Sequence, residues 1–217
     1  MPKSGKGEAS DILEGKGFAH ISMSSLLMGQ IMKDQRLKAH EINRALMLTS
    51  ARNYRKTEPG MLARLSMEAI SQLHPNTKGA IVDGIRNLGE IETLISMCGE
   101  RGDELHLLGV KVSDDFEIDC KIRFQRLEAN LKQRNDGTFD PPNWEAFKEN
   151  SRLEWDDPDP AGIHVKPCLD DIQRRSFGRI LENGLKKDGT LKEIDEWRHD
   201  INEYAASLEG QTHHPEK

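Results

Sequence analysis

The sequence has few aromatic residues and no long apolar stretch. Aromatic side chains make up 5% of the 217 residues and apolar side chains 35%, which is low but compatible with a folded domain. No apolar run approaches the ~20 residues that a membrane-spanning helix needs. The opening residues Met1-Pro2-Lys3 lead into no signal-peptide core. These absences predict a cytoplasmic protein without a membrane partner.

The sequence also contains few cysteines, and its basic residues do not outnumber its acidic ones. Cys98, Cys120 and Cys168 are odd in number and form no C-x-x-C pair, which is typical of incidental thiols in a reducing compartment. The pair His213-His214 is too short a tract to indicate a metal site, so we predict no metal held by the protein alone. The formal net charge of −6 argues against a general nucleic-acid binder.

Short apolar runs alternate with helical patterns along the chain. Strands are expected at 18–22, 78–83, 105–112 and 179–183. Helices are expected from about residue 7, from Ser24 or Ser25, over 40–56, 62–73, 88–97, 118–134 and 144–155, and after a capping box at Thr190–Glu193. This alternation predicts an α/β fold with a mostly parallel sheet and helices on both of its faces.

The segment from about 135 to 167 differs from the rest of the chain. It contains five prolines, the last of them Pro167, and a run of aspartates, with a single helix capped by Asn143. Such an insertion indicates either a lid over a binding site or an exposed loop without a function. The fold is predicted to occupy residues 1–210 as one domain, with a disordered tail over 211–217.

The stretch Ser4-Gly5-Lys6-Gly7 resembles the end of a phosphate-binding loop, G-x-x-x-x-G-K-[ST]. In such a loop, backbone N–H groups at a helix N-terminus and a lysine surround the nucleotide phosphates. The first glycine of the motif would fall one position before Met1, and so would the strand that feeds the loop. The alternative is that this short Gly/Lys run is only a frayed terminus.

Further segments follow in the order found in P-loop nucleotide kinases. The most specific is I-V-D-G-I-R-N at 81–87, and the others are 17–24, 55–63, 123–127 and 188–191. The chain most resembles the dephospho-CoA kinase-like branch, which is itself similar to deoxynucleoside monophosphate kinases. The resemblance covers about residues 4–200. It implies a P-loop kinase-type three-layer sandwich with a helical lid and with its first strand missing, and transfer of a phosphoryl group from ATP, with Mg²⁺, to a nucleotide-like acceptor.

The resemblance also assigns roles to residues. It implies cofactor binding by Gly5, Lys6, Gly7, Asn183 and Gly184. It implies catalytic roles for Lys6, Asp83, Arg126 and Arg134, and substrate binding by Arg55, Asp83, Arg86 and Arg152. Arginine suits these tasks because its planar fork bonds phosphate oxygens bidentately. The alternative for each arginine is a solvated helix face.

Several positions depart from the pattern. Gly7 stands where many such loops carry a Mg²⁺-binding Ser or Thr, and Glu8 follows it. Ser25 and Ser151 replace acidic residues, and four residues are inserted between Asn183-Gly184 and Asp188-Gly189-Thr190. A second hypothesis is therefore a degenerate nucleotide-binding or regulatory module. The acceptor stays unnamed at this stage, and a homodimer stays open.

Overall fold

The computed structural model describes residues 4–131, 143–186, 188 and 190–211, and its element order is that of an α/β protein. The first half contains α1 (Lys6–Gly15), β1 (Ala19–Ser22), α2 (Met23–Gln35), η1 (Ala39–Glu41), α3 (Arg44–Thr57), α4 (Met61–Ile70), β2 (Ala80–Asp83) and α5 (Leu88–Arg101). The second half contains β3 (Leu107–Lys111), α6 (Phe116–Leu131), α7 (Trp144–Trp155), α8 (Val165–Arg174), β4 (Gly178–Glu182) and α9 (Ile194–Gln211). The four predicted strands are therefore confirmed, each within two residues of its expected ends.

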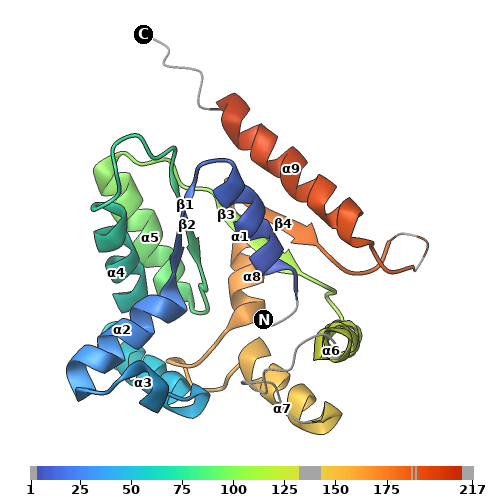
Figure 1. The fold of residues 1–217 in the computed structure, drawn as a ribbon, viewed down its shortest axis with the longest axis horizontal. Coiled ribbons are helices and arrows are strands. Elements are labelled where there is room, and N and C mark those ends of the chain that lie inside the picture. Colours follow the sequence, from blue (N-terminus) through green and yellow to red (C-terminus); the bar gives the residue numbers. More distant parts are fainter. Residues whose placement is uncertain (1–3, 132–142, 187, 189, 212–217) are drawn as a thin grey trace.

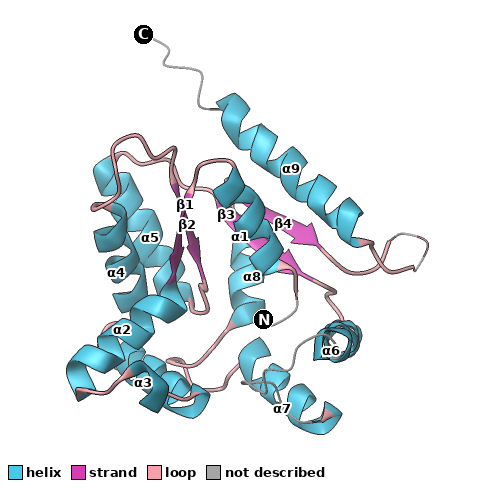
Figure 2. Ribbon diagram, viewed as in Figure 1, coloured by secondary structure: helices cyan, strands magenta, loops and turns pink. Residues whose placement is uncertain are grey.

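The strands form two separate parallel pairs (Figure 2). β1 pairs with β2, with Ala19 opposite Ala80 and Ser22 opposite Asp83. β3 pairs with β4, with Leu107 opposite Gly178. β2 and β3 do not pair with each other within the described residues. The single continuous sheet suggested by the alternating pattern is thus replaced by two half-sheets.

Helices cover both faces of the strand pairs (Figure 1). α1 packs on β1, β2 and α9, while α9 contributes Trp197 and Ile201 to a cluster with Leu181 of β4. On the other face, α4 packs on β1, and α8 packs on β3 and β4. α5 lies against α4 and α8 and so joins the two halves on that face.

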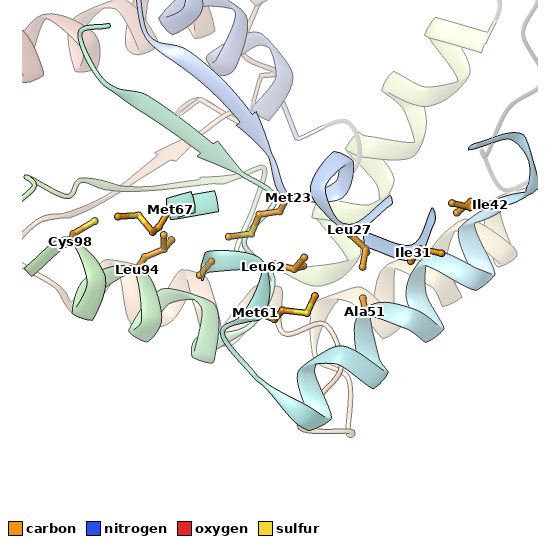
Figure 3. Packing of buried hydrophobic residues seen from close by; sticks show 11 residues of the cluster. Met23, Leu27, Ile31, Ile42, Ala51, Met61, Leu62, Met67, Leu94 and Cys98 are labelled. Atoms are coloured by element: carbon orange, nitrogen blue, oxygen red, sulfur yellow. The ribbon is translucent and has the colours of Figure 1, made fainter. Parts of the chain in front are cut away.

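The largest buried cluster lies below the β1–β2 pair, where α2, α3, α4 and α5 meet (Figure 3). Met23 and Ile31 of α2 are buried in it, and so are Met67 of α4 and Leu94 of α5. In α2, Met23, Leu27 and Ile31 recur every four residues, so one face of this helix is apolar and packs against the neighbouring helices.

The segment expected to be a lid is only partly within the described residues, because 132–142 lie outside them. Its second half forms α7, which begins after the predicted cap: the Asn143 side chain accepts a hydrogen bond from the Ala146 N–H at 2.9 Å. Phe147 is buried against α6, and the Phe124 and Trp144 rings meet edge to face with 5.3 Å between centroids. α7 is therefore packed on α6 by aromatic contacts.

Two local predictions were wrong. No helix was expected over 165–174, where α8 lies, because Pro167 obscured the repeat of Cys168, Leu169 and Ile172. Pro167 falls in the first turn of α8, where backbone N–H groups have no helical acceptor in any case. The Thr190–Glu193 capping box does not form either. Thr190 instead bonds Asp188 in a turn, and the Glu193 N–H donates to Glu196 Oε2 at 2.9 Å.

None of the helices in the described part of the chain combines the length and apolarity needed to cross a bilayer.

Candidate functional site

The start of α1 is held in place by the last helix of the chain. Gly5 precedes α1 with φ of 99°, a left-handed conformation that glycine adopts without strain. A Cβ atom at Gly5 would lie 2.2 Å from Asn183 Nδ2 and 2.8 Å from Trp197 Nε1. The Trp197 indole N–H donates to the Gly5 carbonyl at 3.3 Å. Only glycine therefore fits this turn, and the turn is part of the packed structure rather than a frayed end.

Lys6 is the first residue of α1 and forms an ion pair with Asp83 at the carboxyl end of β2. His20 Nε2 lies 2.9 Å from the same Asp83 oxygen, and His20 Nδ1 lies 2.7 Å from Glu14 Oε1. Burial raises the pKa of Asp83, but hydrogen bonds and charge from Lys6 and His20 outweigh it and hold the pKa below its usual value. Asp83 is thus an ionised carboxylate beside a helix N-terminus.

Asn183 connects the start of α1 to the β3–β4 half. Its backbone N–H donates to Lys111 O at 2.8 Å, and its side-chain amide donates to Ser4 O at 3.0 Å. Its Oδ1 accepts from Arg126 Nη2 at 3.2 Å. Arg126 is half-buried, and desolvation lowers its pKa without removing its charge at neutral pH. Asn183 and Arg126 therefore lie close to Ser4 and Gly5.

At Gly184 there is no room for a side chain. A Cβ atom there would lie 1.8 Å from the Val112 carbonyl oxygen. The turn after β4 thus approaches the backbone after β3 too closely for any side chain. This close approach is independent of any cofactor contact.

Two of the three arginines expected to bind the acceptor, Arg55 and Arg86, are paired with buried carboxylates. Arg55 is 6% exposed, and its Nη2 lies 2.8 Å from Glu90 Oε1, with Glu90 fully buried. Glu90 also accepts the Arg86 backbone N–H at 2.8 Å. Arg86 Nη1 lies 3.1 Å from Glu154 Oε2, and Glu154 is bound by Arg44 as well. α3, α7 and the loop after β2 are therefore joined by charge pairs.

Arg152, to which the resemblance assigns substrate binding, is not brought to α1. The Arg152 side chain is 70% exposed and lies over the Phe116 ring at 5.6 Å from its centroid. Arg134 lies outside the described residues.

Two residues of this site were not predicted. His20 sits on an exposed position of β1, and nothing in the local sequence indicates that β1 and β2 would pair with His20 close to Asp83. Trp197 lies in the helix expected after Thr190–Glu193, and no contact with Gly5 was predicted for it. An indole N–H needs a partner when it is buried, which is the signal that could have suggested a polar contact for Trp197.

The residues present at the start of α1 fit an anion better than they fit a metal held by protein ligands alone. Backbone N–H groups at the start of α1, with Lys6, form an arrangement that suits an anion. Among the described residues no group of three metal-binding side chains occurs. Magnesium needs only one or two carboxylates when phosphates and water supply the rest, and Asp83 can provide one. Glu8 is turned away, toward Arg198 at 2.5 Å.

Comparison with known proteins gives distant relatives. No protein-family model matches the sequence. Over 161 aligned residues, the chain is 29% identical to a UPF0200 protein of Thermococcus onnurineus, with 71% of this chain and 75% of the relative covered. UPF0200 proteins of Thermococcus kodakarensis and Thermococcus gammatolerans are 28% and 27% identical over the same length. The name UPF0200 states no activity, so the similarity provides relatives but not a reaction.

Proposed function

We propose that this chain binds a nucleotide through the start of α1 and transfers a phosphoryl group from ATP to a nucleotide-like acceptor, of the deoxynucleoside monophosphate or dephospho-CoA type. The observation that carries the proposal is the position of Lys6. It is the first residue of a helix whose N-terminus faces Asp83, at the carboxyl end of a parallel strand, where α/β proteins bind ligands. The resemblance to P-loop nucleotide kinases supplies the reaction class.

The proposal assigns separate roles to Lys6, Asp83 and Arg126. Lys6 and the first N–H groups of α1 hold the β- and γ-phosphates, which requires Lys6 to leave Asp83. Asp83 then accepts a proton or a metal contact beside the acceptor. Arg126, next to Asn183, places positive charge over the group in transfer. ATP supplies the phosphoryl group, and Mg²⁺ neutralises its charge when both are bound.

Arg86 suits the acceptor better than Arg55 does. The Arg86 side chain is 28% exposed, so it can exchange Glu154 for a phosphate on the acceptor. Arg55 is buried on Glu90, and removing it from that carboxylate would leave an unpaired buried charge. Arg55 is therefore proposed to position the loop that carries Arg86, through Glu90.

A second candidate function is a nucleotide-binding or regulatory module without transfer. The pairing of Arg55 and Arg86 with carboxylates favours it, because neither charge is free for an acceptor in this state. The absence of a hydroxyl at Gly7 and Glu8 favours it as well. Binding of ATP without transfer to any nucleoside monophosphate or to dephospho-CoA would select this candidate over the first.

Lys6→Ala tests the shared premise of both candidates. We expect it to weaken Mg²⁺-ATP binding in calorimetry by roughly 2 kcal/mol, the scale of a lost charged hydrogen bond. Lys16→Ala is the matched control, because Lys16 lies just past the other end of the same helix and should leave the affinity unchanged. Equal affinity in the Lys6 variant and in the unmodified chain would contradict a phosphate site at α1.

A further inference from the structure

Glu154 of α7 is bound by two arginines that come from other parts of the chain. Its Oε1 accepts from Arg44 Nη2, and its Oε2 lies 3.1 Å from Arg86 Nη1. The Glu154 side chain is 7% exposed, whereas those of Arg44 and Arg86 are 34% and 28% exposed. Burial raises the pKa of Glu154, but nearby positive charge, chiefly that of Arg86, outweighs burial and holds the pKa below its usual value. Glu154 is therefore a carboxylate held between two guanidinium groups.

Both arginines lie on backbone that other contacts fix. Arg44 is the first residue of α3, which packs on α2. The Arg86 N–H donates to Glu90 at 2.8 Å, and the Arg86 carbonyl accepts the His164 N–H at 2.7 Å. None of these contacts involves the Glu154 side chain. The two arginines therefore stay close to each other when Glu154 is withdrawn.

The seam between α3 and residues 154–159 consists of ion pairs, and α3 and α7 lie at the same end of the molecule (Figure 1). Further along α3, Arg52 binds Asp157, and Lys56 Nζ lies 3.6 Å from Asp159 Oδ2. The apolar side chains of α3 pack with α2, α4 and α5, while those of α7 pack with α6. Within the part of the chain that the structure describes, no apolar cluster contains side chains from both α3 and α7. Opening this seam therefore breaks charge pairs and leaves the apolar clusters intact.

The charges at Glu154 do not balance. Among these three side chains, the two positive charges of Arg44 and Arg86 face the single negative charge of Glu154. A phosphate monoester carries a charge of about −1.5 to −2 at pH 7 and has three acceptor oxygens. It can therefore neutralise both arginines and accept paired hydrogen bonds from each guanidinium group. Glu154 occupies the position of such a group but supplies less charge and fewer oxygens.

We propose that Glu154 is an autoinhibitory anion: it occupies a phosphate-binding clamp formed by Arg44 and Arg86, and a ligand that carries a phosphate group must displace it to bind there. The clamp rests on the proposed function, in which Arg86 binds the acceptor phosphate, and it adds Arg44 as the second arm. The arrangement in this structure is then the inhibited state of the acceptor site. The affinity for the acceptor is reduced by the fraction of molecules in which Glu154 has left the clamp.

The first experiment measures the binding of inorganic sulfate, a tetrahedral dianion, by calorimetry at constant ionic strength. Glu154→Gln keeps the shape of the side chain and removes its charge. We expect this variant to bind sulfate roughly tenfold more tightly than the unmodified chain, because the competing anion is gone. Adding Arg44→Gln to Glu154→Gln should abolish the gain. Glu58→Gln is the matched control: it removes a carboxylate that accepts from Arg64 at 2.8 Å, outside the clamp, and should leave the affinity unchanged.

The second experiment follows Glu154 itself in the unmodified chain. A buried carboxylate between two arginines should react slowly with a water-soluble carbodiimide and an amine, and sulfate does not consume this reagent. If sulfate displaces Glu154, its labelling, as measured by mass spectrometry, should rise along a sulfate titration at constant ionic strength. Labelling of Glu58, which is partly exposed, should stay constant.

Equal sulfate affinities of Glu154→Gln and the unmodified chain would overturn the proposal, and so would a gain that survives the loss of Arg44. If Glu154→Gln does not fold, the labelling decides, and constant labelling of Glu154 across the titration contradicts displacement. Neither experiment uses ATP or a variant of Lys6. Failure of the clamp is therefore distinguishable from failure of nucleotide binding at α1, which the Lys6→Ala calorimetry measures.

Discussion

At the scale of single residues, the buried pair of Arg55 and Glu90 ties α3 to α5 and to the loop after β2. Glu90 has no exposed surface and accepts both the Arg55 guanidinium and the Arg86 N–H. Removing one partner of such a pair leaves an uncompensated buried charge, at a cost of about 3–5 kcal/mol. We therefore expect Arg55→Ala to destabilise the protein by that amount in urea unfolding.

The control for this pair is a double-mutant cycle. Combining Arg55→Ala with Glu90→Ala should cost less than the sum of the two single changes, because no charge is then left buried alone. Simple additivity of the two free-energy changes would show that the residues act independently and would contradict the pairing.

Asp83 gives a pH dependence of known sign. Its pKa lies below the usual value of 3.8 in the folded protein, since Lys6 and His20 outweigh the effect of burial. The ionised Asp83 therefore stabilises the fold at pH values above its unfolded-state pKa. This contribution to stability is lost as the pH falls through the folded-state pKa of Asp83. We expect Asp83→Asn to cost on the order of 1 kcal/mol at pH 7, because Lys6 is partly exposed.

The measurement is urea unfolding of both proteins from pH 7 down to pH 3. The difference between them should be constant above about pH 5 and should shrink as the pH falls below about 4. A difference that grows toward acid would mean that the carboxyl group, not the carboxylate, is the stabilising form.

At the scale of elements, Trp197 is the residue of α9 that contacts the turn at the start of α1. Trp197 is fully buried and donates to the Gly5 carbonyl, next to Lys6. Trp197→Ala should cost about 3–5 kcal/mol in unfolding free energy, the usual range for a buried large aromatic residue. Trp197→Phe is the matched variant, because it keeps most of the apolar area and loses only the N–H.

The two variants distinguish the packing of the Trp197 ring from the effect of its N–H on the turn at Gly5. If the indole N–H fixes the turn at Gly5, Trp197→Phe should weaken nucleotide binding more than its small loss of stability predicts. Unchanged nucleotide affinity in Trp197→Phe would restrict Trp197 to a packing role.

The elements could largely be predicted from the sequence, and their pairing could not. The strands at 80–83 and 107–111 are short apolar runs that need no tertiary information. α8 was missed because a proline in a first turn looks the same in sequence as a proline that ends a helix. The contacts of Asp83 with His20, and of Gly5 with Trp197, depend on segments far apart along the chain, and no local pattern encodes them.

At the scale of the whole molecule, the core is divided into separate clusters, and each cysteine belongs to a different one. Cys98 lies with α2 to α5, Cys168 with α5, β3 and α8, and Cys120 with α6 and α7. Burial, with the nearby charges of Glu90 and Asp171, raises the pKa of Cys168 from 9.0 to about 12. That is a difference of three pH units and thus a thousandfold smaller thiolate fraction.

We expect alkylation of Cys168 at pH 8 to be on the order of a thousandfold slower in the native protein than in urea, as measured by mass spectrometry. Cys98 and Cys120, whose pKa values are also raised by burial, serve as internal comparisons for the other two clusters. Labelling of Cys168 at the rate seen in urea would show that the cluster around β3 and α8 opens freely.

The contacts that hold α1 join residues that are far apart along the sequence. Ser4 and Asn183 are separated by 179 positions, and Gly5 and Trp197 by 192. On the ribosome, α1 therefore emerges well before Asn183 and Trp197, which fix its turn. A nascent chain must therefore carry the Gly5–Lys6 turn without those partners until residues 183 and 197 have been translated. Any anion site at this turn is completed only after residue 197 has been synthesised, so a chain cut short before that residue would lack it.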